Sequence, residues 1–241
     1  MKEFGEIKKE IYDITISTGE SKYGKFLNKL IIPNYDRRGE NDDWDLWYFS
    51  DNTEFCKNSA EYYLEEIEKQ FNEFEKFQRD FDDTESIEKN EYRPERLRRF
   101  FGCFSFYLYA SLESFAHEIN IFYELKVERR EVSITKIKKQ LKVTRENSSL
   151  LPCLEMFLSD SKVQTFRNYR DAIMHGYVFP LSGREHGLFV KESPKDAPFN
   201  FADTTLNLPD FCKSSYSKVN SFICAGWRCF EKDELSHPES D

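Results

Sequence analysis

Glycine and proline are scarce in this sequence, with 9 and 8 of them among 241 residues. This scarcity disfavours collagen-like folds and all-β folds that are dominated by loops. No apolar run approaches the roughly 20 residues that a membrane-spanning helix needs. The N-terminal residues also contain no apolar segment of the kind found in a secretory signal. The sequence therefore predicts neither a membrane-spanning nor a secreted protein.

The 6 cysteines show neither a C-x-x-C pair nor a spacing typical of metal ligands. We interpret them as reduced thiols in the core of a cytoplasmic protein. The phosphate-binding motif G-x-x-x-x-G-K-[S/T] and the motifs G-x-G-x-x-G, H-E-x-x-H and G-x-S-x-G do not occur either. The sequence therefore predicts no metal centre and no cofactor.

Aromatic residues are abundant at 16%, which argues against a disordered chain, and 33% of the residues are charged. Apolar residues recur with helical spacing, which predicts an all-α fold: a bundle of about four long helices with a β-hairpin insert. Residues 1–50 are expected to be an N-terminal extension packed on the body, and 51–241 a helical domain. The predicted helices cover about 54–82, 93–126, 132–143, 148–158, 162–175 and 209–232, and the hairpin about 176–192.

The predicted helix at 93–126 is apolar nearly all round. A helix of this kind is either central in a bundle or buried in a dimer.

The helix predicted to begin at about 162 has a capping signal at its start. Ser161 and Gln164 fit the capping pattern S-x-x-Q. Gly176 fits the position just past the end of that helix.

Charge is distributed unevenly along the chain, although its net value is −9. Residues 126–170 carry 11 Lys and Arg but only 5 Asp and Glu, so one basic zone lies in an acidic protein. This zone is either a solvated helix face or a strip that binds phosphate groups. The candidate RNA-binding residues are Lys136, Lys138, Lys139, Lys142 and Arg167.

Residues 166–177, FRNYRDAIMHGY, combine ionisable and apolar side chains on one predicted helix. Arg170 falls on the apolar stripe, seven residues after Val163. A cation there is costly unless it is paired or lines a cavity. Asp171 and His175 are four residues apart, so the carboxylate can orient the imidazole and raise its pKa. These three residues are the candidate catalytic group.

Two further interpretations of this segment stay open. Arg170 and His175 lie about 140° apart around an ideal helix, so both can face one substrate only if the helix ends before His175 or two chains combine their residues. Alternatively the segment has a structural role, in which His175 simply precedes a helix-ending Gly176 and Arg170 pairs with a core carboxylate such as that of Glu113.

The hexapeptide Arg170-Asp-Ala-Ile-Met-His175 resembles the R-[N/D/H]-x-x-x-H signature of the HEPN domain superfamily (higher eukaryotes and prokaryotes nucleotide-binding). The aromatic segment 104–120 is similar to the helix that precedes this signature in stand-alone bacterial HEPN proteins. The resemblance covers about 54–232. Residues 1–50 and the hairpin depart from the minimal HEPN fold.

The resemblance implies a metal-independent endoribonuclease, acting as a toxin or in phage defence, whose active site forms between two protomers. His175 would act as general acid or base on the ribose 2′-hydroxyl, Arg170 would stabilise charge on the phosphate, and Asp171 would orient His175. Tyr177 matches a tyrosine that nucleotidyltransferase antitoxins adenylylate in some relatives, although core packing also explains it. The resemblance equally allows an inactive module that binds RNA, a nucleotide or a protein partner.

Overall fold

The computed structural model describes residues 40–82, 94–174, 181–184, 187–190 and 206–236. These residues are mostly helical, which confirms the expected helical fold class. The helices are α4 (Glu40–Asp82), α5 (Pro94–Phe122), α6 (Ile134–Thr144), α7 (Leu150–Ser159), α8 (Ser161–Met174) and α9 (Leu208–Ser236), with a short 3-10 helix, η2 (Arg129–Glu131).

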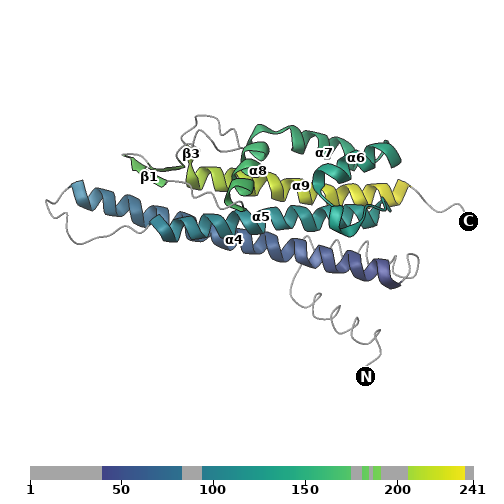
Figure 1. Cartoon of the computed structure of the whole chain (residues 1–241), viewed down its shortest axis with the longest axis horizontal. Coiled ribbons are helices and arrows are strands. Elements are labelled where there is room, and N and C mark those ends of the chain that lie inside the picture. The colour runs from purple at the N-terminus through teal and green to yellow at the C-terminus, as the bar shows by residue number, and fades with distance from the viewer. Residues whose placement is uncertain (1–39, 83–93, 175–180, 185–186, 191–205, 237–241) are drawn as a thin grey trace, which may run out of the picture.

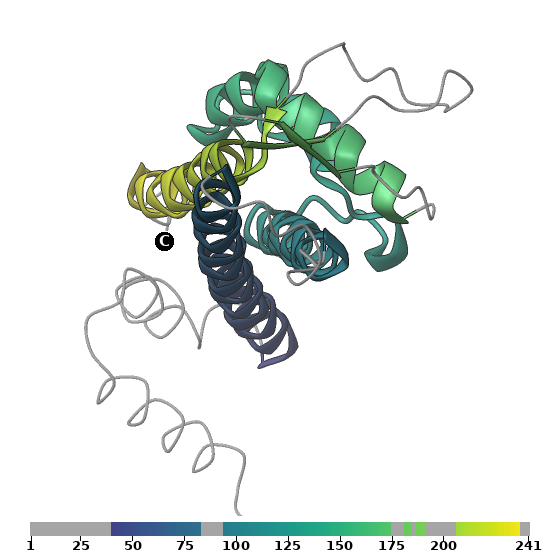
Figure 2. The ribbon, with the colours of Figure 1, turned by 90° about the vertical axis from the view of Figure 1, so that its left-hand side faces the viewer.

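Three long helices, α4, α5 and α9, run side by side along the length of the molecule, and α6, α7 and α8 lie over them (Figure 1). Viewed end-on, α4 lies between α9 and α5, while α8 crosses above α5 (Figure 2). The core lies where these helices meet. It is rich in fully buried aromatic and aliphatic side chains, which include Phe104, Phe115, Phe166, Phe230, Ile67 and Ile137.

Helix α4 begins at Glu40, well before the predicted start near 54, and continues through residue 50, where the domain boundary was placed. Leu46 and Phe49 are buried and extend the apolar stripe of the helix toward its N-terminus. Ser50 and Thr53 occupy the next buried positions, and these polar residues interrupt the pattern on which the prediction depended.

The start of α8 is capped by Asp160 rather than by the predicted pair Ser161 and Gln164. The Asp160 Oδ1 atom accepts hydrogen bonds from the backbone N–H groups of Lys162, at 2.9 Å, and Val163, at 3.2 Å. The Gln164 side chain donates instead to the Leu158 carbonyl. Asp160 also pairs with Lys218 of α9, which fixes the first turn of α8 against the long helices.

Asp233 of α9 fixes the start of α7. Its carboxylate accepts hydrogen bonds from the Ser149 N–H, at 3.0 Å, and from the Tyr123 hydroxyl, at 2.7 Å. The carboxylate thereby satisfies an N–H at a helix N-terminus from another element and links three segments.

The predicted hairpin at 176–192 lies partly outside the described residues. Strand β1 (Leu181–Arg184) pairs antiparallel with β2 (Gly187–Val190), and β2 pairs with β3 (Leu206–Asn207). Residues 182–184, in the middle of the predicted hairpin, lie in β1 and pair with 187–189.

Within the described residues, none of the helices combines the length and apolar character required to cross a bilayer. All six cysteines are free thiols. Cys56, Cys212 and Cys224 are buried, whereas Cys103, Cys153 and Cys229 are partly buried.

Candidate functional site

The packing of α8 against α5 and α9 orients the candidate residues. Val163 and Phe166 are buried as predicted, and Tyr169 adds a third buried side chain. The Tyr169 ring contacts Phe101 and Phe211 edge-on, with centroids 6.4 and 5.3 Å away. Burial raises the pKa of Tyr169 to about 12. Because Tyr169 anchors the helix, the next residue, Arg170, is directed along the surface of α5.

Arg170 lies over an aromatic ring and pairs with two carboxylates. Its guanidinium carbon is 3.6 Å from the centroid of Tyr109 of α5. Its Nη1 donates to Asp171 Oδ1 at 2.7 Å, and its Nη2 lies 3.9 Å from Glu113 Oε1. The Arg170 side chain is 22% exposed. It is therefore mostly buried, as the stripe predicted, yet open to solvent on one side.

The electrostatics of this cluster are set by opposing effects. Burial raises the pKa of the Glu113 carboxyl, while the Arg170 charge lowers it. Burial also raises the pKa of the Tyr109 hydroxyl, with a further increase from Glu113 and an opposing decrease from Arg170. Glu113 thus matches the partner that the structural interpretation assigned to Arg170. Sequence reasoning missed Tyr109, although its spacing of four from Glu113 places both on one face of α5.

Two of the predicted site residues lie outside the described residues. His175 directly follows Met174, the last residue of α8, and Tyr177 lies two residues further on. The hydrogen bond expected between Asp171 and His175 stays a prediction. In the structure Asp171 is 40% exposed and pairs with Arg170.

Arg167 joins α8 to the basic zone. Its Nη2 donates to Thr135 Oγ1 at 3.1 Å, at the start of α6. Helix α6 buries Ile134, Ile137 and Leu141, which turns its lysines outward. The predicted Lys139 and Lys142 are exposed, and Lys138 is half-buried. The structure thus brings Arg167 close to the first turn of this basic helix.

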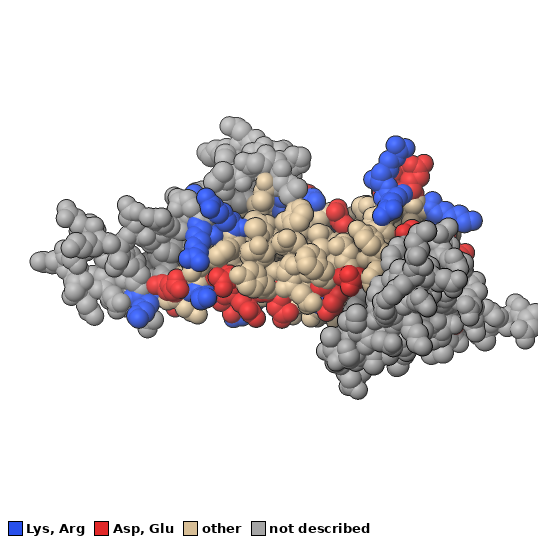
Figure 3. All heavy atoms as spheres, turned by 90° about the horizontal axis from the view of Figure 1, so that it is seen from below, with Lys and Arg blue, Asp and Glu red and all other residues tan. Residues whose placement is uncertain are grey.

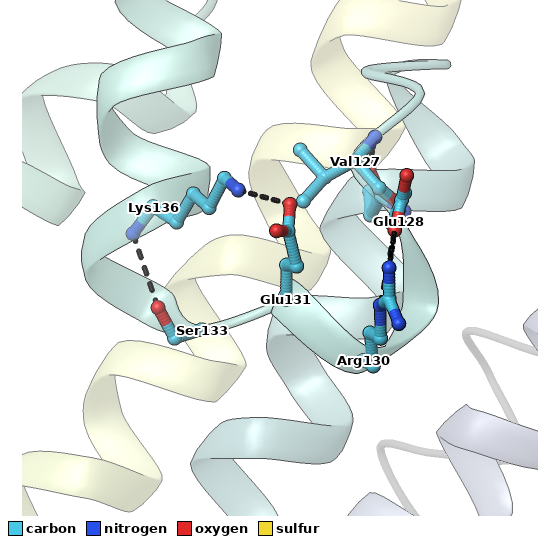
Figure 4. A network of polar contacts seen from close by, with 7 residues as sticks. Val127, Glu128, Arg130, Glu131, Ser133 and Lys136 are labelled. Atoms are coloured by element: carbon cyan, nitrogen blue, oxygen red, sulfur yellow. Dashed lines mark hydrogen bonds and ion pairs between the residues drawn. The ribbon is translucent and has the colours of Figure 1, made fainter.

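Part of the basic zone is already paired within the chain. Lys136, another predicted RNA-binding residue, pairs with Glu131, and Arg130 pairs with Glu128 at 3.1 Å (Figure 4). Ser133 caps α6 by accepting a hydrogen bond from the Lys136 N–H at 3.3 Å. Lys138, Lys139 and Lys142 form no ion pair with another described residue. These three lysines are therefore the better candidates for phosphate contacts.

Two other polar residues of α5 do not join the cluster. The His117 ring stacks on Phe49, with centroids 4.2 Å apart and planes 5° apart. Asn120 donates to the Val127 carbonyl and accepts from its N–H, at 3.0 and 3.1 Å. His117 therefore packs against α4, and Asn120 shapes the turn after α5.

A second polar cluster, missed by sequence reasoning, lies on the opposite side of α5. Glu118 is fully buried and accepts hydrogen bonds from Thr53 of α4 and from the Trp227 indole N–H of α9, the latter at 2.9 Å. Burial raises the pKa of Glu118 to about 7. Because no opening leads to Glu118, which is 0% exposed, we assign this cluster to the core rather than to a site.

Across the part of the chain that the structure describes, no three His, Cys, Asp or Glu side chains gather as metal ligands. Comparison with protein-family models, curated proteins and solved structures gave no match to this chain. The Arg170 cluster of Tyr109, Glu113, Arg170 and Asp171 is therefore judged on its own chemistry. A guanidinium fixed by a ring, with one face open, is suited to binding a phosphate group.

Proposed function

We propose that this chain is a metal-independent endoribonuclease of the HEPN type, a helical bundle with a hairpin insert after the motif. In this proposal His175 acts as general acid or base on the ribose 2′-hydroxyl, and Arg170 stabilises charge on the phosphate. Asp171 orients His175. The chemistry needs a 2′-hydroxyl, so RNA is cut and DNA is not. The products carry a 2′,3′-cyclic phosphate and a 5′-hydroxyl.

The observation that supports the proposal most is the placement of Arg170. A surface arginine is usually mobile, whereas this guanidinium is fixed at 3.6 Å from the Tyr109 centroid and remains 22% exposed. A guanidinium positioned before substrate arrives has less entropy to lose on binding phosphate. Arg167 lies three residues before Arg170 on α8, contacts Thr135 at the start of α6 and supplies further positive charge.

A second copy of the chain completes the proposed site. Arg170 and His175 lie about 140° apart on an ideal helix, so facing helices from two protomers would bring them together. An antitoxin or a nucleotidyltransferase acting on Tyr177 is a further proposed partner.

One observation favours the alternative of an inactive module that binds RNA, a nucleotide or a protein. Arg170 already contacts two carboxylates, Asp171 at 2.7 Å and Glu113 at 3.9 Å. These carboxylates compete with an incoming phosphate and would repel it. The catalytic proposal therefore requires Arg170 to exchange at least one of them for the substrate.

The experiment is RNA cleavage in EDTA by the full chain and by His175→Ala, with the ends of the products mapped. His237→Ala is the matched control, because it removes an imidazole far from the motif in sequence. We expect cyclic-phosphate ends from the unmodified chain and the control, and a rate at least about 100-fold lower for His175→Ala.

Equal cleavage by His175→Ala would show that the site assignment is wrong. Intact RNA with all three folded proteins would favour the inactive module. A salt-sensitive RNA complex that weakens on changing Lys138, Lys139 and Lys142 to Glu would then identify RNA as the ligand of that module.

A further inference from the structure

Two cysteine thiols from different helices face each other where α7 packs on α9. The Sγ atoms of Cys153 in α7 and Cys229 in α9 are 3.9 Å apart, although the residues are 76 positions apart in the chain. Helix α7 lies over α9 in the fold (Figure 1). Both cysteines are partly buried. The packing of the two helices therefore creates this thiol pair, as we call Cys153 and Cys229, which the sequence spacing does not reveal.

The backbone of Ser149 holds both thiols at the start of α7. The Ser149 carbonyl accepts hydrogen bonds from Cys229 Sγ at 3.4 Å and from Cys153 Sγ at 3.8 Å. The Ser149 hydroxyl donates to the Cys229 carbonyl at 3.3 Å, and the Ser149 N–H donates to Asp233 of α9 at 3.0 Å. Because one residue contacts both cysteines and Asp233, the start of α7 keeps the two sulfur atoms together.

Other cysteines of the chain have neighbours of a different kind. Cys56 and Cys224 each donate to the side-chain oxygen of an asparagine four positions earlier, at 3.8 and 3.6 Å. Cys103 is hydrogen-bonded to Tyr63. A disulfide needs a second sulfur within reach, which these amide and hydroxyl partners do not supply. The thiol pair does supply it.

A bond between the paired sulfurs requires only a short movement. Bonded sulfurs in a disulfide lie about 2.05 Å apart, so the two Sγ atoms must approach by about 1.9 Å from their separation of 3.9 Å. Rotation of each cysteine about its Cα–Cβ bond moves its sulfur over such a range. The helices can therefore stay in place while the bond forms.

The two thiols of the pair have different parts in this chemistry. Burial raises the pKa of Cys229 to about 11, and the neighbouring Cys153 and Asp233 add to the increase. Cys229 therefore stays protonated at neutral pH. Because the thiolate is the form that attacks an oxidant, the first reaction falls to Cys153.

The charge of the protein favours an uncharged oxidant. The chain has a net charge of −9, and acidic side chains line one edge of the face seen from below (Figure 3). This field repels anionic disulfides such as oxidised glutathione, whereas hydrogen peroxide is neutral. Hydrogen peroxide is also small enough to reach a partly buried thiol. The matching class of oxidant is therefore a hydroperoxide.

We propose that Cys153 and Cys229 are an oxidation site, at which hydrogen peroxide converts the two thiols into a disulfide that joins α7 to α9. In the first step the Cys153 sulfur attacks the peroxide, an S–O bond forms, the O–O bond breaks, and water leaves a sulfenic acid. In the second step the Cys229 sulfur attacks the Cys153 sulfur. The S–S bond forms, the S–O bond breaks, and the hydroxyl leaves as water with the Cys229 proton. Two thiols thus lose two electrons, and one peroxide becomes two waters.

The disulfide would stabilise the fold. It closes a loop from 153 to 229, which contains the whole of α8 with Arg170. A bond that closes so long a loop removes much conformational freedom from the unfolded chain. The reduced chain, with all six thiols free, is the resting form, and this site is independent of the proposed ribonuclease activity.

The experiment treats the reduced full chain with hydrogen peroxide and digests it with trypsin without a reducing agent. Cleavage at Arg228 separates Cys229 from Cys224 and yields the peptides 146–162 and 229–232. We expect mass spectrometry to find these two peptides joined, with the loss of two hydrogens. Met156 is 72% exposed in the first peptide, and its oxidation is distinguished because it adds one oxygen.

The melting temperature gives a second readout. We expect it to rise by about 5 to 10 °C on oxidation and to return when dithiothreitol reduces the bond. Cys153→Ser and Cys229→Ser should each abolish both the joined peptides and the rise. Cys103→Ser is the matched control, because it removes another partly buried thiol and should keep both.

Sulfinic acid at Cys153 without joined peptides would overturn the proposal. Joined peptides found only in a species of twice the mass would also overturn it, because the bond would then link two chains. A lower melting temperature in the oxidised chain would show that the fold does not accommodate the bond. Reversal by dithiothreitol is measured on the unmodified chain, so the test stands even where a serine variant fails to fold. Cleavage of RNA does not enter either readout.

Discussion

Helix α5 presents two glutamates to two different environments, and the contrast separates a site from a core. Glu113 is 47% exposed on its side chain and lies 3.9 Å from the Arg170 guanidinium. Glu118, only five residues later, is fully buried and accepts hydrogen bonds from the neutral donors Thr53 and Trp227. A carboxyl with a cation and access to solvent can exchange partners, whereas a buried carboxyl with neutral donors holds helices together.

The largest expected effect comes from removing the buried carboxyl. Glu118→Ala takes away the acceptor of the Trp227 indole N–H and one of the two acceptors of the Thr53 hydroxyl, which keeps the Phe49 carbonyl, and it leaves a small cavity. We expect the free energy of unfolding at pH 5 to fall by about 4 kcal/mol, measured by urea denaturation. Glu113→Ala is the matched variant, and it should cost less than about 1 kcal/mol. Equal losses in the two variants would remove the distinction between the two environments.

The second-largest expected effect is the pH dependence of stability that Glu118 causes. The folded state holds the Glu118 pKa at about 7, above the value near 4.3 expected in the unfolded chain. The folded state therefore retains its proton as the unfolded state loses one, so Glu118 lowers stability by about 3 kcal/mol as pH rises from 4.5 to 7. Glu118→Gln should abolish this decrease in urea titrations at several pH values.

His117 changes the stability of the protein with pH in the opposite direction to Glu118. The contribution of Glu118 must therefore be measured by comparison with a variant. Burial, together with the charge of Arg129, lowers the His117 pKa, so this residue makes the protein less stable as pH falls through that pKa. The decrease assigned to Glu118 is the difference between the unmodified chain and Glu118→Gln at each pH. If the two curves run parallel, Glu118 does not titrate in the folded protein.

Alanine substitutions at Gly226 and Gly102 test the same contrast between a packed helix face and an open one. A Cβ at Gly226 of α9 would lie 2.2 Å from Phe115 Cζ, and the Phe115 ring is confined by Phe222, Trp227 and Phe230. We expect Gly226→Ala to lower the melting temperature, at a cost of about 2 kcal/mol. Gly102→Ala meets nothing within 4 Å and should be neutral or slightly stabilising. The reverse order of the two variants would contradict the packing described for α5.

The smallest expected change in the free energy of unfolding comes from replacing Tyr109, whose ring lies under the Arg170 guanidinium. Tyr109→Leu removes the aromatic face at 3.6 Å from the guanidinium carbon and should cost about 1 kcal/mol in urea denaturation. Tyr109→Phe keeps the face and should leave stability unchanged. A loss of the same size in Tyr109→Phe would assign the effect to the hydroxyl instead of to the ring.

The amino-acid pattern predicted most of the helical fold because the apolar stripes are regular. In α9, whose helix was predicted at about 209–232, the apolar residues from Phe211 to Phe230 recur with helical spacing and are buried. The predicted start of α4 was wrong because two buried positions of the helix hold the polar residues Ser50 and Thr53. Thr53 is hydrogen-bonded to Glu118. A polar network of this kind has no periodic signal, because its members lie far apart in sequence.

The site was predictable only in part for a similar reason. The pairing of Arg170 with Glu113 agrees with the structural alternative drawn from the sequence, since a cation on an apolar stripe needs a carboxylate. Tyr109 and Thr135 were missed because their contacts with Arg170 and Arg167 cross between helices. The capping of α8 by Asp160 was missed because Ser161 and Gln164 fit a known pattern equally well.

The central claim is that Arg170 is positioned for phosphate, and its most direct test is a pair of measurements on Arg170→Gln. The account predicts cleavage of RNA in EDTA at least about 100-fold slower than with the unmodified chain, together with a loss of stability of no more than about 2 kcal/mol. Unchanged cleavage, or a protein that no longer folds, would contradict it and assign Arg170 a structural role alone.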